Sequence, residues 1–141
     1  MVFIVPYSMV EVEDLREGNF ITPVLHSESH YYKVISISEN KESVTFINCS
    51  KYAEPHNAKG EIALNICFLI PVTPELLEHS SFKQTSPLVY VKDGMIVQFK
   101  RYGVAYVQAN SEDTPVAIEG VNELQNAYKH FTGNELAISF G

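Results

Sequence analysis

Residues 88–101 read Leu-Val-Tyr-Val-Lys-Asp-Gly-Met-Ile-Val-Gln-Phe-Lys-Arg, and they contain the clearest structural signal in the chain. Two runs rich in β-branched and aromatic residues flank the dipeptide Asp93-Gly94. A two-residue type I′ turn needs positive φ at both central positions, and Asp-Gly is one of the few pairs that supply it. The stretch therefore predicts an antiparallel hairpin with strands at 88–92 and 95–101.

The C-terminal half completes a small layered unit. Tyr102-Gly103 predicts a second turn into a strand at 104–108, which gives a three-stranded meander. One helical stripe is formed by Val121, Leu124, Tyr128 and Phe131, and Gly133-Asn134 is a fitting end for that helix. We therefore expect a helix over 121–132 that packs on the meander, and residues 136–140 are a candidate last strand.

The N-terminal half is predicted to be β-rich. Strands are expected at 10–13 and 20–25, a hairpin at 31–37 and 44–48 with its polar tip at 39–42, and a central strand at 62–70 after an exposed loop. Along the first hairpin strand, one side is expected to carry Tyr31, Lys33, Ile35 and Ile37, and the other side Tyr32, Val34 and Ser36.

A short helix is expected next. Thr73 is a plausible N-cap and Pro74 suits the first helical position, so the helix should run to His79, and residues 80–87 are expected to be a linker.

These elements predict an α+β protein that is mostly antiparallel β. Residues 10–70 would form a small curled sheet or an SH3-like barrel, and the C-terminal half a β-meander packed by one α-helix. With 141 residues the chain is expected to be one domain over 1–141, softly divided into a β-rich half at 9–79 and the meander with its helix at 80–141.

Charge and hydropathy limit the partners. The chain has 10 Lys and Arg against 17 Asp and Glu, a net charge of −7, which repels a phosphate backbone or an anionic membrane unless a local basic patch overrides it. No apolar run approaches the length of a membrane span. The start, 1–6, lacks the basic region and the cleavage site of a signal peptide. A cytoplasmic protein is expected, and residues 1–8 are read as a short strand or as an extension upstream of a start at Met9.

The sequence offers little for catalysis. Cys49 and Cys67 sit in strand-like runs and are expected to be small buried hydrophobes, although a bridge between them stays open at this stage. His26 and His30 have a spacing that some metal sites use, but they lack a zinc-motif framework. No nucleophile elbow, phosphate-binding glycine loop or readable carboxylate pair is present. We expect no enzyme activity, no metal and no cofactor.

Cations and aromatics mix on the meander, as they do on surfaces that stack nucleic acid bases. The alternative is an ordinary sheet with one core face and one solvated face, which the net charge favours. Gln125 and Asn126 lie off the helical stripe, where they would bond loop backbone or face a partner. The candidate interaction surface comprises Tyr90, Lys92, Phe99, Lys100, Arg101, Tyr102, Gln125 and Asn126.

Three segments carry a resemblance to a known family. They are 15–19 (Leu-Arg-Glu-Gly-Asn) with 32–34, then 70–77 (Ile-Pro-Val-Thr-Pro-Glu-Leu-Leu), and 121–128 (Val-Asn-Glu-Leu-Gln-Asn-Ala-Tyr) with 132–136 (Thr-Gly-Asn-Glu-Leu). In this order and spacing the chain resembles a family of small uncharacterised proteins of Bacteroidetes phages, prophages and mobile elements. Residues 1–8, Pro74 and the pair 81–82 depart from the family pattern.

The resemblance implies a phage or mobile-element origin and an arrangement of the domain, but it implies no catalysed reaction. We therefore expect a non-enzymatic binding or adaptor protein of phage or mobile-element origin, whose partner is a protein, either a second copy or another chain. The alternative is a small-ligand or nucleic-acid binder that uses the basic and aromatic meander face.

Overall fold

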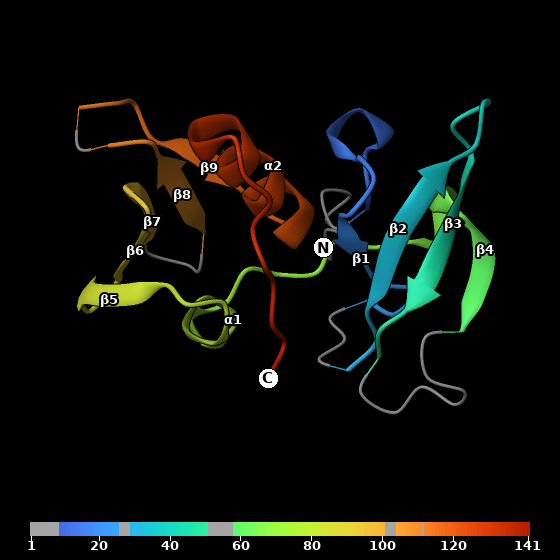
Figure 1. Ribbon diagram of the computed structural model, residues 1–141, viewed down its shortest axis with the longest axis horizontal. Coiled ribbons are helices and arrows are strands. Elements are labelled where there is room, and N and C mark those ends of the chain that lie inside the picture. Colours follow the sequence, from blue (N-terminus) through green and yellow to red (C-terminus); the bar gives the residue numbers. More distant parts are fainter. Residues whose placement is uncertain (1–8, 26–28, 51–57, 101–103, 111) are drawn as a thin grey trace, which may run out of the picture. The chain divides into compact units, whose positions relative to one another are not determined.

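The computed structural model describes residues 9–25, 29–50, 58–100, 104–110 and 112–141. The chain divides into two compact units, Met1–Pro71 and Val72–Gly141, and each is described by itself. As predicted, the fold is α+β with mostly antiparallel strands, arranged as one sheet in each unit (Figure 1).

The first unit contains a four-stranded antiparallel sheet in the order β1-β2-β3-β4. Its strands are β1 (Phe20–Ile21), β2 (Tyr32–Ile37), β3 (Ser43–Asn48) and β4 (Lys59–Ala63), and two 3-10 helices flank them, η2 (Val12–Asp14) and η3 (Leu64–Ile66). The predicted hairpin is confirmed as β2 and β3.

The SH3-like barrel alternative is wrong, because this sheet is not closed. After β4 the chain returns to the β1 end of the sheet at a single residue, Phe68. Its backbone exchanges two hydrogen bonds with Thr22, at 2.8 and 3.1 Å, and it also forms an isolated bridge with Met9. One bridged residue does not make the continuous strand pairing that closes a barrel.

Two strands predicted in this unit are also wrong. Residues 12 and 13 of the expected 10–13 strand belong to η2, and the expected central strand at 62–70 ends at Ala63, on a strand at the edge of the sheet. The reason lies in the burial pattern, because Leu64 and Cys67 are buried whereas the two residues between them are exposed. A spacing of three residues suits a 3-10 turn, and the amide of Cys67 bonds the carbonyl of Leu64 at 3.0 Å.

A bulge changes the faces of β2. The pairing of β2 with β3 shifts register between Val34 and Ser36, which leaves one extra residue on β2. Tyr32, Val34 and Ile37 consequently all pack against the core of this unit, and the predicted strict alternation fails after Val34. The buried residues of that core are Leu15, Ile21, Val34, Val44, Leu64 and Cys67.

The Leu-Arg-Glu-Gly-Asn segment forms a tight turn at the entrance to β1. The Asn19 side chain is fully buried, and its Oδ1 accepts a 2.8 Å bond from the Arg16 amide, while the Asn19 amide bonds the Arg16 carbonyl at 3.1 Å. Gly18 has φ +91°, a conformation that glycine adopts without strain, and its amide bonds the Val34 carbonyl at 2.8 Å. This motif therefore fixes the position of β1 beside β2.

The second unit contains a five-stranded antiparallel sheet in the order β5-β6-β7-β8-β9. The strands are β5 (Lys83–Ser86), β6 (Val89–Lys92), β7 (Met95–Phe99), β8 (Ala105–Gln108) and β9 (Val116–Ile118). The predicted meander is confirmed as β6, β7 and β8, and β5 replaces part of the linker predicted at 80–87. Asp93 and Gly94 have φ of +50° and +83°, as the type I′ turn requires.

Both predicted helices are present, as α1 (Pro74–His79) and α2 (Val121–Thr132). The Thr73 Oγ1 caps α1 by accepting from the Leu76 amide at 3.2 Å. α2 ends at Gly133, whose φ is +79°. The C-terminal segment after α2 forms no strand at 136–140, and its Ser139 backbone instead bonds the Ser80 hydroxyl after α1.

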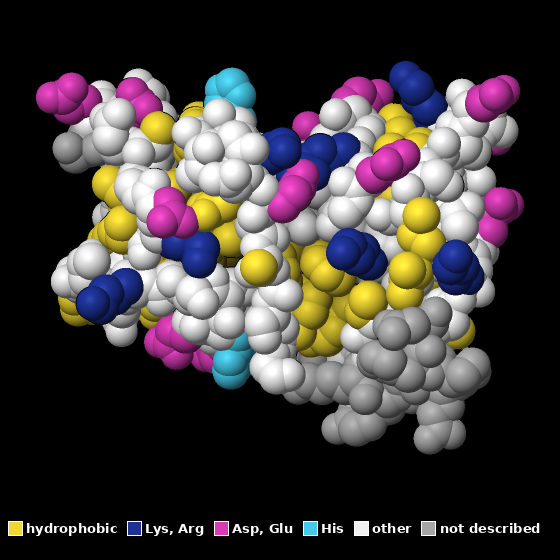
Figure 2. Space-filling model, viewed as in Figure 1, with side chains coloured by type: hydrophobic (Ala, Val, Ile, Leu, Met, Phe, Trp, Pro, Cys, Tyr) yellow, Lys and Arg dark blue, Asp and Glu magenta, His cyan; other side chains and the backbone are white. Residues whose placement is uncertain are grey.

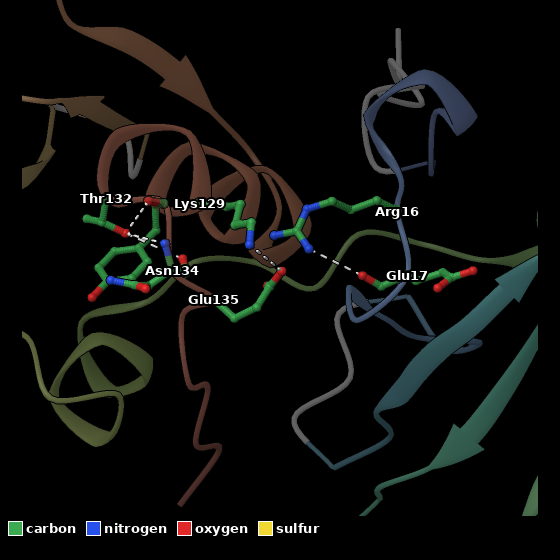
Figure 3. A network of polar contacts seen from close by, with 7 residues as sticks. Arg16, Glu17, Lys129, Thr132, Asn134 and Glu135 are labelled. Atoms are coloured by element: carbon green, nitrogen blue, oxygen red, sulfur yellow. Dashed lines mark hydrogen bonds and ion pairs between the residues drawn. The ribbon is translucent and has the colours of Figure 1, made fainter.

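Side chains close the end of α2, as Figure 3 shows. The Thr132 hydroxyl donates to the Tyr128 carbonyl at 2.8 Å and accepts from the Asn134 amide at 3.1 Å. Lys129 and Glu135 approach to 3.7 Å on the surface. The Thr-Gly-Asn-Glu segment is therefore a helix end.

The orientation of α2 differs from the prediction. Its buried residues are Val121, Asn122, Leu124, Gln125 and Tyr128, whereas Phe131 is 38% exposed. The buried stripe is thus rotated toward the amide side chains of Asn122 and Gln125, of which Gln125 was predicted to lie off it. The Tyr128 hydroxyl donates to the Asp93 carboxylate, which holds α2 against the β6–β7 turn.

Candidate functional site

Side chains alternate between the two faces of the β5–β9 sheet. One face is its core face, and the side chains of Tyr90, Met95, Val97, Phe99, Ala105 and Val107 are buried there. The residues between them point the other way and are half-buried. We call this second surface the outer face and define it by Val89, Val91, Ile96, Gln98, Tyr106 and Gln108.

Strand pairing places the outer-face residues in two rows. Val89, Gln98 and Tyr106 lie opposite one another across β6, β7 and β8. Val91, Ile96 and Gln108 form the second row. The face is therefore a mixed surface in which apolar side chains alternate with amides and one phenol.

Lys100 extends the outer face beyond the end of β7. It lies two residues after Gln98, and its amide bonds the Val104 carbonyl at 2.7 Å. Its Nζ lies 5.7 Å from the centre of the Tyr106 ring, within the range of a cation–π contact. On β5, at the edge of the sheet, Lys83 pairs with Val91 and adds a second cation to the same side.

The charge of this sheet is opposite in sign to that of the chain. Strands β5 to β9 contain no Asp or Glu, while Lys83 lies on the side of the outer face and Lys100 follows β7; Lys92 pairs with buried Met95 and belongs to the core side. Figure 2 shows acidic side chains on the surfaces of both units. The outer face is thus a local region without carboxylates in a chain of net charge −7.

Three of the eight residues of the predicted interaction surface are buried in the structure. Tyr90 and Phe99 are 3% and 6% exposed on the core face, where their rings meet edge to face at 5.9 Å. Gln125 is 2% exposed within α2. These three side chains are therefore covered and present almost no surface to a partner.

Of the remaining predicted residues, Lys100 is exposed, Lys92 and Asn126 are partly exposed, and Arg101 and Tyr102 lie outside the described residues. Tyr106 and Ile96 are outer-face residues that the predicted set omits. Side chains alternate between faces along a strand, and the Asp-Gly turn pairs residue 92 with residue 95. Following this alternation through the turn would have separated the faces, because it places Tyr90 and Phe99 together on the core face.

The thiols and imidazoles form no reactive group among the described residues. Cys49 and Cys67 are free thiols. Burial raises the pKa of Cys67 to about 11, so it is protonated at neutral pH, and it donates to the Ala63 carbonyl at 3.4 Å. His30 is exposed beside Ser29, and His26 falls in a part of the chain that is not described.

Neither a metal-binding cluster nor a membrane-spanning helix is found among the described residues. They contain no group of three or more His, Cys, Asp or Glu side chains arranged to hold a metal ion. No helix in this part of the chain is long and apolar enough to cross a membrane.

Comparison with known proteins found no match among protein-family models, curated proteins or solved structures.

Proposed function

We propose that this chain is a non-enzymatic, cytoplasmic binding or adaptor protein that takes an acidic segment of a protein partner on the outer face of its second sheet. The observation that carries the proposal is the composition of that face. It combines half-buried Val89, Val91 and Ile96 with Tyr106 and Lys100, and no carboxylate lies in the five strands. A chain of net charge −7 would otherwise repel such a partner.

The chemistry of the outer face suits protein recognition. Aromatic residues are enriched at interfaces because one ring supplies a large, rigid contact area. The Lys100–Tyr106 pair presents such a ring together with a cation. Complementary charge then favours an acidic partner and raises the rate of encounter.

A phage, prophage or mobile-element origin is part of the proposal, and it is supported by the three sequence segments described above. Their roles in the structure are architectural. The first is the Asn19 turn, the second carries the Thr73 cap, and the third is α2 with its Gly133 end. None of them presents a catalytic group, which agrees with a binding protein.

A small-ligand or nucleic-acid binder is the alternative function, and the Lys100–Tyr106 pair is the observation that favours it. Bases stack on aromatic rings, and a neighbouring cation strengthens the stack. The acidic net charge works against this alternative, because phosphates bind to clusters of cations.

The experiment uses full-length, isotope-labelled protein and a synthetic hexapeptide, acetyl-Glu-Leu-Glu-Tyr-Glu-Leu-amide, followed by amide chemical shifts. We expect shifts at outer-face residues. Lys100→Glu should weaken binding about fivefold, equivalent to roughly 1 kcal/mol. The matched control is Lys59→Glu, which makes the same charge change at an exposed position on β4 of the other unit.

Equal weakening by the two variants would mean that the peptide responds only to net charge, and the proposal would then fail. Shifts confined to other surfaces, or no shifts at millimolar peptide, would also contradict it.

A further inference from the structure

A second surface feature, in the first unit, has the opposite character. Three segments that are distant in sequence surround a groove with a volume of about 540 Å³. They are Met9–Glu13, the Lys41–Glu42 end of the β2–β3 turn, and Ala63–Asn65 at the start of η3. The volume falls in the range of small-molecule and side-chain pockets. All three segments belong to one unit, so its geometry is internal to that unit.

Backbone bonds join two walls of the groove and shape the third. The Leu64 amide bonds the Glu42 carbonyl at 2.8 Å and joins η3 to the β2–β3 turn. The Asp14 amide bonds the Glu11 carbonyl at 3.0 Å and closes η2.

The turn itself is held by side chains. Ser38 Oγ accepts from the amides of Glu42 and Ser43, at 3.2 and 3.1 Å, and Asn40 Oδ1 also accepts from the Glu42 amide. A groove with walls fixed in this way is organised before a ligand arrives, which lowers the entropy cost of binding.

The floor of the groove is apolar and its rim is acidic. Val10 and Val12 pack against the core of the unit, and Leu64 belongs to that core. The residues that line the groove include three exposed carboxylates, from Glu11, Glu13 and Glu42, and one cation, Lys41. Along the upper edge of this unit, Figure 2 shows hydrophobic side chains between acidic and basic ones.

We propose that this groove is a docking site for a basic segment of a partner protein and takes one of its lysine or arginine side chains. Long cationic side chains lay their methylene stems on apolar surface while the charged head stays at the rim. Here the stem would lie on Val10, Val12 and Leu64, and the head would meet the glutamate carboxylates. Charge complementarity selects a basic segment over an acidic one.

This site is separate from the outer face and selects the opposite charge. A chain with both surfaces would bind two different partners, which is the property that defines an adaptor. The groove does not depend on the outer face, because it is built entirely from residues of the first unit.

The test titrates full-length labelled protein with acetyl-Lys-Leu-Lys-Leu-Lys-amide and follows amide shifts. We expect shifts at residues 9–13, 41–42 and 63–65. The double variant Glu11→Gln/Glu13→Gln, and separately Glu42→Gln, should weaken binding at least threefold. Glu61→Gln is the control, because Glu61 is an exposed carboxylate of the same unit outside the groove lining. It should change binding by less than twofold.

Two further arms decide what occupies the groove. The same peptide with acetylated lysines should lose the groove shifts, because it keeps the shape and removes the charge. Spermidine tests a free polyamine, and equal binding by spermidine would overturn the assignment to a protein segment. Absence of groove shifts at 5 mM peptide, or equal loss with Glu61→Gln, would also overturn it.

Discussion

Cys67 is a buried thiol in the core of the first unit. Its side chain is fully excluded from solvent within the core of the first unit, with Leu64 three residues before it. Desolvation disfavours the thiolate, which raises the pKa of Cys67 from 9.0 to about 11. A thiol in this state is a small hydrophobe with one weak bond to a carbonyl, and its chemistry is suppressed.

This shift predicts a loss of stability at alkaline pH. Between pH 9 and pH 11 the unfolded thiol ionises while the folded thiol stays protonated, so the unfolded state is favoured as pH rises. The stability linked to Cys67 is fully present below pH 9. We expect the stability advantage of wild type over Cys67→Ala to shrink by about 1.4 kcal/mol between pH 8 and pH 10.

Urea melts at the two pH values measure the effect, and Cys49 is kept in both proteins so that its own titration cancels. A wild-type advantage that stays constant from pH 8 to pH 10 would contradict the burial of this thiol.

Among secondary-structure elements, α2 shows what periodicity predicts and what it misses. The helix ends at the predicted residues because Gly133 adopts the left-handed conformation that glycine favours. Its buried face is rotated so that Asn122 and Gln125 are covered and Phe131 is partly exposed. A pattern of apolar residues cannot show that a protein covers amide side chains, because burial of polar groups depends on partners supplied by the tertiary structure.

Two substitutions and a control test this orientation. Leu124→Ala should cost about 2–5 kcal/mol, because it leaves a cavity at a fully buried site. Gln125→Ala should cost about 1–3 kcal/mol, because it removes a buried amide and strands the groups around it. Asn126→Ala, at the neighbouring partly exposed position, should cost under about 1 kcal/mol.

Denaturant melts of the three single variants give the comparison. If Gln125→Ala loses no more stability than Asn126→Ala, then Gln125 lies at the surface, as the hydrophobic periodicity predicted. The orientation of α2 in the structure would then be wrong.

Strands show the same limit of sequence reasoning. Local signals located the Asp-Gly turn, the β2–β3 hairpin and the Thr73 cap, since each depends on a few adjacent residues. The bulge in β2 and the end of β4 at Ala63 depend on contacts with distant residues, such as the bond from the Leu64 amide to the Glu42 carbonyl. The candidate surface mixes buried and exposed residues for a related reason, because cations and aromatics were grouped by proximity in sequence across two faces of one sheet.

For the molecule as a whole, net charge predicts weak affinity for nucleic acid. The chain carries −7, and the outer face contributes few cations for phosphate contacts. We expect fluorescence anisotropy with a labelled 20-nucleotide single strand to show no binding below about 100 µM at low salt. Binding that falls steeply with salt and drops on Lys100→Glu would contradict this expectation and would support the alternative function.

The strand order of both sheets follows the order of the chain, so every strand pairs only with its neighbours in sequence. Such a topology has low contact order, and the entropy lost in closing each loop is small. We therefore expect rapid folding in which each strand pairs with the strand that precedes it in the sequence. During synthesis the first unit can complete its sheet while the second is still being made, because domains generally fold as units from the N-terminus. Phe68 is among the last residues of this unit to be synthesised, so its bridges with Met9 and Thr22 can form only late, after the four strands are complete.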